Sequence, residues 1–234
     1  MKLNYKTYWR KTGLKGKWGN IYLERISYHK PKYFLEIGVF CGVTARNTCD
    51  LLYKININNF TYTGIDLFGG DKSSSADEIE PKFLLNQKFS NPLKNIYYNL
   101  ILRENLNNIK ERGANHFFCR GDVFDWLKQF NRKGRKFGLV ILDPPSFSRS
   151  GKSGSFSVIN DYSSLVELAA DLVEPFGWIL ACSNHRKLTN NKFISSIKEG
   201  VKNAKRKIID IELSQMPFDF SGEKYLKSVW VKLS

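Results

Sequence analysis

One stretch of the chain limits its fold more than any other: Asp143-Pro144-Pro145 follows directly on Phe137–Leu142. Five apolar residues in a run of six are typical of a strand buried in a parallel sheet. Proline cannot continue a strand ladder, so the two prolines predict that the strand ends in a rigid turn. In open α/β sheets ligands bind at the carboxyl ends of the strands. We therefore expect Asp143, the Pro144 carbonyl and Phe147 to align a flat ring that carries a nitrogen nucleophile.

The rest of the chain alternates apolar runs with helical patterns, which predicts a doubly wound α/β sheet. The pattern indicates seven strands in a mostly parallel, Rossmann-like sheet with an antiparallel last strand. We expect strands at 33–38, 61–66, 116–120, 137–142, 178–182, 207–213 and 226–233, and helices at 20–28, 44–54, 95–112, 123–129, 161–173 and 190–204. Residues 69–92 read as a long polar connection, and 151–155 as a flexible loop.

Size and cysteine usage place this sheet in a single domain of a reducing compartment. The 234 residues are 42% hydrophobic, which suits one globular domain at 33–234 preceded by a basic arm and short helix at 1–32. No apolar run approaches a membrane span, and the start of the chain is not signal-like. The four cysteines have no paired spacing, so we expect neither disulfides nor zinc, and a cytoplasmic location.

Charge is the unusual feature of the composition. The formal net charge is +15, and the basic residues occur in groups, of which the first, Lys2 to Lys17, contains no acid. Aromatic residues are interleaved there, a pattern that suits RNA binding through phosphate neutralisation and base stacking. A lysine-rich composition with solvated lysine faces is the alternative interpretation.

Acidic residues close each of the first four strands and predict a cofactor site. Glu36, Asp66, Asp122 and Asp143 each lie in or just after one of these strands. Each aspartate alone is more often an N-cap or turn residue, but four in succession indicate a binding edge. Gly38 and Gly42 permit a tight turn and a close approach of the backbone to a ligand. Their spacing does not match a phosphate-binding glycine loop.

This order of motifs resembles the class I S-adenosylmethionine-dependent methyltransferases across nearly the whole chain. The second half resembles the large-subunit ribosomal RNA methyltransferases, in Gly121–Leu127, Leu142–Arg149, Ala181–Arg186 and Tyr225–Lys227. The first half, from Phe34 to Asn99, is more similar to small-molecule O-methyltransferases, so the chain reads as a mosaic. The RNA-binding domain that usually precedes the ribosomal RNA enzymes has no counterpart in this sequence.

The resemblance implies S-adenosyl-L-methionine as cofactor and assigns roles to individual residues. The implied cofactor-binding residues are Glu36, Gly38, Gly42, Asp66, Asp122, Val123 and Asp143. The implied catalytic residues are Asp143, Pro144, Phe147 and Asn184. Members of the family methylate cytosine C5 or guanine N7, and the C5 enzymes carry a nucleophilic cysteine where this chain has Asn184. Because Cys182 lies within an apolar strand, where burial raises the pKa of a thiol, we expect a nitrogen target.

Three classes of function stay open at this point. The leading hypothesis is an RNA methyltransferase that acts on a base nitrogen of ribosomal RNA, in rRNA processing. The alternatives are a small-molecule or glycan O-methyltransferase and a non-catalytic RNA-binding protein on the same fold. Acidic residues in the long connection (Asp71, Asp77, Glu78, Glu80) read as solvating charges, so we expect no metal. The methylated position, the role of the 69–92 insertion and the oligomeric state are left open.

Overall fold

A computed structural model describes residues 3–8, 16–56, 59–66, 77–78, 92–111, 115–150, 154–214 and 225–234. Of these, 56, 77–78, 92–99, 111, 147–150 and 154–155 are described by their backbone alone. Contacts divide the chain into two compact units, a first of 1–34 and 39–121 and a second of 35–38 and 122–234. These units do not correspond to an N-terminal arm and a following domain, so the boundary that the sequence predicts at residue 33 stays a prediction.

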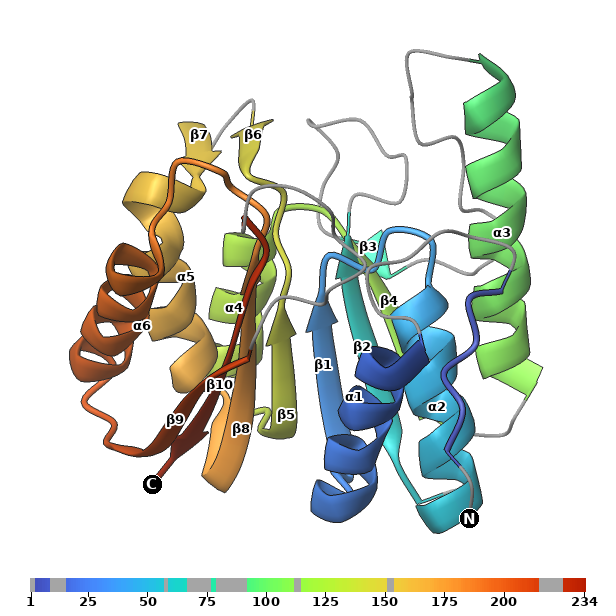
Figure 1. Cartoon of the computed structure of the whole chain (residues 1–234), viewed down its shortest axis with the longest axis horizontal. Helices are drawn as coiled ribbons and strands as arrows, with labels where there is room; N and C mark the ends of the chain where they lie inside the picture. Colours follow the sequence, from blue (N-terminus) through green and yellow to red (C-terminus); the bar gives the residue numbers. More distant parts are fainter. Residues whose placement is uncertain are drawn as a thin grey trace. The chain divides into compact units, whose positions relative to one another are not determined.

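In the part of the first unit that the structure describes, helices and strands follow one another along the chain (Figure 1). Its elements are α1 (Gly16–His29), the first residues of β1 (Tyr33–Ile37), α2 (Val43–Asn56), β2 (Thr61–Asp66), β3 (Asp77–Glu78), α3 (Pro92–Glu111) and β4 (Asn115–Arg120). In its core Phe34 packs on Tyr62, whose ring also contacts Phe118. β2 pairs in parallel with β4 from Thr61 opposite Asn115 to Asp66 opposite Arg120.

The second unit contains the remaining strands and three further helices. Its elements are the end of β1, α4 (Val123–Arg132), β5 (Phe137–Leu142), β6 (Phe147–Ser150), β7 (Gly154–Ser157), α5 (Val158–Ala170), β8 (Val173–Ser183), α6 (Asn190–Asn203), β9 (Ile208–Ser214) and β10 (Lys227–Leu233). Helices α5 and α6 lie side by side in Figure 1, where Gly200 lets α6 approach the backbone of Ser163. β5 is buried at every residue except Gly138, as the apolar run predicts.

The strand order is β3-β4-β2-β1-β5-β8-β10-β9. β5 and β8 are parallel, and β10 is antiparallel to both β8 and β9. Seven of these strands form the mostly parallel sheet with an antiparallel last strand that the sequence predicts, and β3 adds a two-residue strand. β3 falls within the predicted polar connection, most of which lies outside the described residues.

Several boundaries differ from the sequence prediction, among them the start of α3 (Pro92, not 95), the end of α4 (Arg132, not 129) and the start of β8 (Val173, not 178). The differences in α1 and α5 have a visible cause. α1 begins at Gly16 and not at Asn20, because the Asn20 side chain accepts a hydrogen bond from the Tyr5 backbone at 2.9 Å instead of starting the helix. α5 runs from Val158 to Ala170, not from 161 to 173, since Val173 already pairs with Phe137 as the first residue of β8. Both differences come from partners distant in the sequence.

The loop expected after the Asp143 turn was wrong in part. β6 and β7 form an antiparallel hairpin from Phe147 opposite Ser157 to Ser150 opposite Gly154, and 151–153 lie outside the described residues. Ser157 then caps α5, because its side chain accepts from the Ile159 backbone at 3.3 Å.

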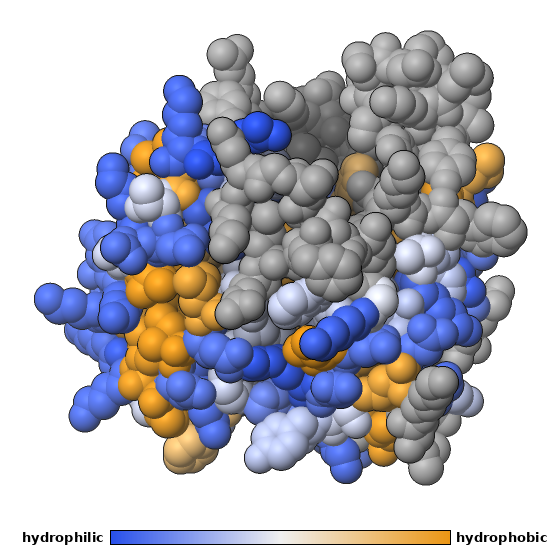
Figure 2. All heavy atoms as spheres, viewed as in Figure 1, coloured by the Kyte–Doolittle hydropathy of each residue, from blue (hydrophilic) through white to orange (hydrophobic). Residues whose placement is uncertain are grey.

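Within the described ranges, no helix is both long and apolar enough to cross a membrane. On the face drawn in Figure 2, the described surface is largely hydrophilic, with apolar residues gathered in separate patches.

Candidate active site

The turn after β5 is fixed by the end of β1, within the second unit. The backbone N–H of Asp143 donates to the Ile37 carbonyl at 3.0 Å. Gly38 has a φ of +86°, and a Cβ there would lie 2.1 Å from the Asp143 carbonyl oxygen. Any larger residue would therefore push the turn away, which explains why glycine is needed at this position.

A buried tyrosine ties the carboxyl ends of β5 and β8 together. The Tyr162 hydroxyl lies 3.2 Å from the Leu142 carbonyl oxygen and 3.1 Å from that of Cys182, so both acceptors share its proton. Burial is the main cause that raises the pKa of Tyr162 well above its ordinary value, with nearby Cys182 and Asp143 adding to the rise. The phenol consequently stays neutral and keeps donating. The ends of the two strands that carry Asp143 and Asn184 are thus held in place.

Asn184 meets the Asp-Pro-Pro turn through a short hydrogen bond. The Ser146 hydroxyl donates to the Asn184 side-chain oxygen at 2.6 Å. Asn184 is exposed, Pro144 is buried, and the Ser183 hydroxyl accepts from the His185 backbone at 3.2 Å. The structure therefore brings Asn184 into contact with Ser146, three positions after Asp143. This contact lies at the carboxyl ends of β5 and β8.

The Asp143 carboxyl group has an unusual affinity for protons. Part of its side chain is open to solvent at the strand end, yet protein encloses the rest, and this desolvation raises its pKa from 3.8 to about 6. Perturbed carboxyl groups of this kind are common where substrates bind. At neutral pH the group is mostly ionised and can accept a hydrogen bond from a ligand.

A buried lysine joins the loop that carries Asn184 to the segment before β10. Lys227 is only 2% exposed, and its ammonium donates to the carbonyls of His185 at 3.1 Å and Tyr225 at 2.7 Å. Burial lowers its pKa from the ordinary value. Both of these partners are carbonyl oxygens, so a buried cation, which is costly to desolvate, fixes two backbone segments. Arg186 also lies over the Tyr225 ring, 5.1 Å from its centroid.

The remaining candidates in the second unit occupy three places. Glu36 is 3% exposed at the end of β1. Asp122 is the N-cap of α4, since its side chain accepts from the Phe124 backbone at 2.8 Å, and Val123 begins that helix. The capping role is the ordinary one for an aspartate before a helix. Phe147 begins β6, and its side chain lies outside the described part of the molecule.

In the first unit, the loop after β1 is built around Gly42 and Asp66. Gly42 has a φ of +69°, its N–H donates to the Val39 carbonyl at 2.9 Å, and its carbonyl accepts from Arg46 as α2 begins. The Asp66 carboxylate accepts from the Phe40 backbone at 2.8 Å, and the Asp66 carbonyl accepts from Gly121 at 3.2 Å. Asp66 thus fixes this loop to the end of β2.

Cys182 is a poor nucleophile. Burial, followed by the nearby Asp143 carboxylate, raises the pKa of its thiol far above the ordinary value, as the sequence predicts. Its sulfur lies 3.8 Å from the Ser228 hydroxyl. Since the thiolate is the reactive form, addition of Cys182 to a ring carbon is disfavoured. Among the described residues, no cluster of histidine, cysteine or acidic side chains suits a metal ion.

Reasoning from the sequence missed Tyr162, Ser146 and the structural role of Lys227. Tyr162 lies in an amphipathic helix, where an aromatic residue reads as ordinary core, so no local signal was available. Lys227 did leave a signal, because it is a lysine in a strand whose neighbours are largely buried and apolar.

Comparison with known proteins finds methyltransferases both by sequence and by structure. No protein-family model matches the chain. It is 37% identical over 83 residues to a Ribosomal RNA large subunit methyltransferase K/L from Methylococcus capsulatus, covering 35% of this chain and 11% of that protein. To the protein of the same name from Aliivibrio salmonicida it is 25% identical over 206 residues, covering 85% of this chain and 26% of that one. The chain therefore spans a minor part of these relatives' length.

Solved structures agree on the fold. SMU.776 in complex with SAH matches with a TM-score of 0.58 and 23% identity, over 86% of this chain and 45% of that one. The O-methyltransferase from Bacillus cereus, also in complex with SAH, matches with a TM-score of 0.53 and 11% identity, over 98% and 84%. These likenesses confirm the class I methyltransferase fold expected from the sequence.

Proposed function

We propose that this chain, a class I S-adenosylmethionine-dependent methyltransferase in fold and in distant sequence similarity, methylates a base nitrogen of ribosomal RNA. The observation that carries the proposal is the 2.6 Å bond from Ser146 to Asn184, which joins the Asp143-Pro144-Pro145 turn to the loop after β8. Two polar side chains with acceptor oxygens thereby meet at the carboxyl ends of neighbouring strands. A flat heterocycle bearing nitrogen is the ligand that such acceptors suit.

The residues assigned to the cofactor fit S-adenosylmethionine. Glu36 is a buried acid, Asp66 ends β2, and Gly38 and Gly42 both have positive φ, which lets the chain turn sharply after β1. In the proposal Glu36, Asp66 and Asp122 bind the polar groups of the cofactor, while Gly38, Gly42 and Val123 supply backbone. S-adenosylmethionine would supply the methyl group as a sulfonium electrophile.

Catalysis then depends mainly on positioning. A neutral ring nitrogen needs little acid or base help to attack a sulfonium methyl, so alignment and exclusion of water make the largest contributions. Asp143, the Pro144 carbonyl and Asn184 would accept hydrogen bonds from the base, and Phe147 would stack on it. Tyr162 and Lys227 hold the strand ends and loop that carry these groups.

The thiol of Cys182 argues for nitrogen over carbon. Methylation of cytosine C5 requires a thiolate that first adds to the ring. The raised pKa of Cys182 leaves almost no thiolate at neutral pH. Asn184, at the position of the nucleophilic cysteine in the resembling C5 enzymes, has no such reactivity.

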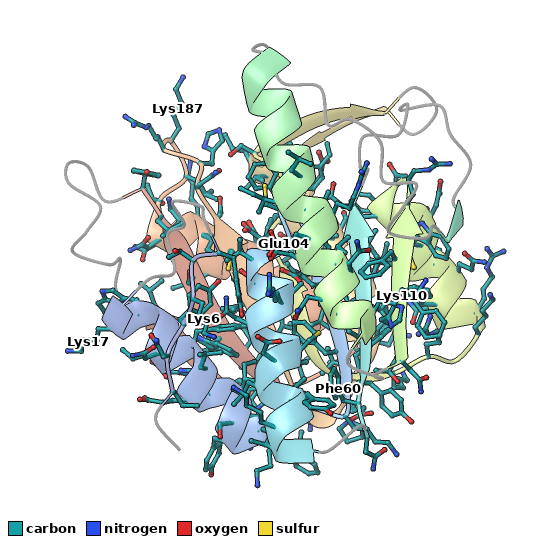
Figure 3. The ribbon with its side chains drawn as sticks, turned by 90° about the vertical axis from the view of Figure 1, so that its right-hand side faces the viewer. Lys6, Lys17, Phe60, Glu104, Lys110 and Lys187 are labelled. Carbon is teal, nitrogen blue, oxygen red and sulfur yellow. The ribbon has the colours of Figure 1, made fainter. Side chains whose placement is uncertain are left out.

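Charge and relatives support RNA as the substrate. The chain carries a net charge of +15, and Arg186 and Lys187 are exposed two and three residues after Asn184. Lys187 points away from the ribbon in Figure 3. A basic and aromatic surface beside the site, with Arg186 over Tyr225, suits phosphate contacts and base stacking. The relatives' names refer to ribosomal RNA of the large subunit.

Incubation with methyl-labelled S-adenosylmethionine and total RNA from cells that lack the enzyme tests this proposal. We expect label in large-subunit ribosomal RNA, reduced when Arg186 and Lys187 are both changed to glutamine. Label in small molecules alone would favour an O-methyltransferase. RNA binding without cofactor binding, measured by calorimetry, would favour a non-catalytic RNA-binding protein.

A further inference from the structure

The described stretch of the basic N-terminal region, residues 3–8, packs against α2. The Lys6 N–H donates to the Asn47 side-chain oxygen at 2.9 Å, and the Asn47 amide donates back to the Lys6 carbonyl at 2.8 Å. Tyr5 is 4% exposed, with its hydroxyl 3.1 Å from that of Thr44. Figure 3 shows Lys6 beside α2. An amide that satisfies both groups of one peptide residue holds a backbone much as a strand partner does.

In this position, the Tyr8 ring stacks on the side chain of Arg46. The guanidinium carbon of Arg46 lies 3.9 Å from the centre of the Tyr8 ring, and the Tyr8 hydroxyl donates to Asp50 at 2.7 Å. Arg46 in turn donates to Glu104 at 3.1 Å and to the Asn105 side-chain oxygen at 3.0 Å. Stacking on Tyr8 restricts the guanidinium, so its donors stay directed at α3. Glu104 is labelled on α3 in Figure 3.

Asn105 completes the path to the loop after β1. It is 1% exposed, and its amide donates to the Cys41 carbonyl at 2.8 Å. A Cβ on the neighbouring Gly42 would lie 3.3 Å from the Cβ of Asn105, so the loop and α3 are in close contact. With its oxygen bonded to Arg46 and its nitrogen bonded to Cys41, Asn105 has one orientation in which both partners are satisfied.

We propose that residues 3–8 brace the loop 39–42, with Arg46 and Asn105 acting as positioning residues for the cofactor. The proposal rests on the proposed function, which assigns this loop to S-adenosylmethionine. A loop held in its binding conformation does not lose affinity to alternative conformations, whereas release of the Cys41 carbonyl would populate them. The N-terminal region therefore contributes to cofactor affinity as well as to charge.

Calorimetry with S-adenosylhomocysteine tests the brace in the full chain. Asn105→Asp keeps the size and the bond to Arg46 but cannot donate to Cys41. We expect it to bind on the order of ten-fold more weakly, the effect of one unpaired buried carbonyl. Tyr8→Ala and Asn47→Ala act further from the loop, and we expect a loss of about three-fold for each.

Tyr22→Phe is the matched control. It removes a buried hydrogen bond to Thr48, 2.6 Å long, between α1 and α2 without touching the loop. We expect a lower melting temperature and unchanged affinity, which separates positioning from general destabilisation.

The outcomes separate the two proposals. If the unaltered chain does not bind S-adenosylhomocysteine, the proposed function fails. If it binds, and Asn105→Asp binds equally well, the brace is wrong. Should Asn105→Asp fail to fold by circular dichroism, the surface variant Tyr8→Ala decides the matter. An unchanged affinity in both Tyr8→Ala and Asn47→Ala would overturn the role of residues 3–8.

Discussion

The two units hold their candidate site residues in different ways. In the first unit, side chains fix backbone: Asp66 holds the Phe40 N–H and Asn105 holds the Cys41 carbonyl. In the second unit, contacts fix the strand ends that present exposed functional side chains, through Tyr162, Ser146 and Lys227. The first arrangement suits a ligand that is held by backbone, and the second suits a base that must be aligned. We therefore expect variants of Asp66 and Asn105 to change cofactor affinity, and variants of Asp143 and Lys227 to change turnover.

The largest effect should come from Asp143→Asn. This change keeps the size of the side chain but removes the carboxylate that would position the base, so methyl transfer should fall on the order of 100-fold or more. Because the carboxylate faces the nucleophile in our account, cofactor affinity should change far less. Single-turnover kinetics and calorimetry would measure the two, and a parallel loss in both would break the distinction between the units.

The same carboxyl group makes a pH dependence testable. Its pKa of about 6 lies above the ordinary 3.8, so the folded state binds the extra proton and stability falls as pH rises between these values. Asp143→Asn should therefore raise the melting temperature more at about pH 7 than at about pH 4. Activity of the unaltered chain should decline as pH falls through about 6. A variant without a pH-dependent gain in stability would show that the carboxyl is ordinary.

Lys227→Met should have the next largest effect. A buried cation replaced by an apolar residue is often neutral or stabilising, yet the His185 and Tyr225 carbonyls would lose the ammonium that joins them. We expect turnover to fall roughly ten-fold with cofactor affinity unchanged. Lys232→Met, on the same strand, is the control, since its ammonium lies over Trp178 and not at the loop. Equal activities in the two variants would show that Lys227 is merely structural.

Asp66→Ala tests the first unit. Loss of the acceptor for Phe40, and of the proposed partner for the ribose hydroxyls, should weaken cofactor binding by roughly 1–3 kcal/mol. With saturating cofactor, turnover should recover. An unchanged affinity would remove Asp66 from the site.

Cys182→Ser should have the smallest effect on activity. For a nitrogen target the thiol does no chemistry, and a polar hydroxyl in this strand should cost stability alone. A covalent adduct between Cys182 and RNA that contains 5-fluorocytosine would instead assign the reaction to cytosine C5.

Elements with a strong local signal were predicted well. β2 and β5 have the predicted ends. Asp66 and Asp143-Pro144 mark in the sequence where each buried apolar run stops. The junction between α5 and β8 was not predictable in the same way. Residues up to Val173 continue a helical pattern, and pairing with Phe137, distant in the sequence, decides that the helix ends earlier.

The candidate site was predictable in its residue types but not in its supports. The spacing of Asp143 and Asn184 after successive strands placed them at one edge, whereas the Ser146 hydroxyl that joins them follows from the course of the turn. The basic N-terminal region gave a charge signal that says nothing of packing. Its packing against α2 depends on the Asn47 and Thr44 side chains. Nothing in the sequence around these two residues indicates such contacts.

The most direct test of the whole account is the identity of the methylated nucleoside. Unmodified large-subunit ribosomal RNA would be treated with the chain and S-adenosylmethionine, digested to nucleosides and analysed by mass spectrometry, with Asp143→Asn in parallel. We predict an N-methylated base that is absent from the Asp143→Asn sample and present with Cys182→Ser. A 5-methylcytidine product that requires Cys182, or RNA left without any new methyl group, would contradict the account.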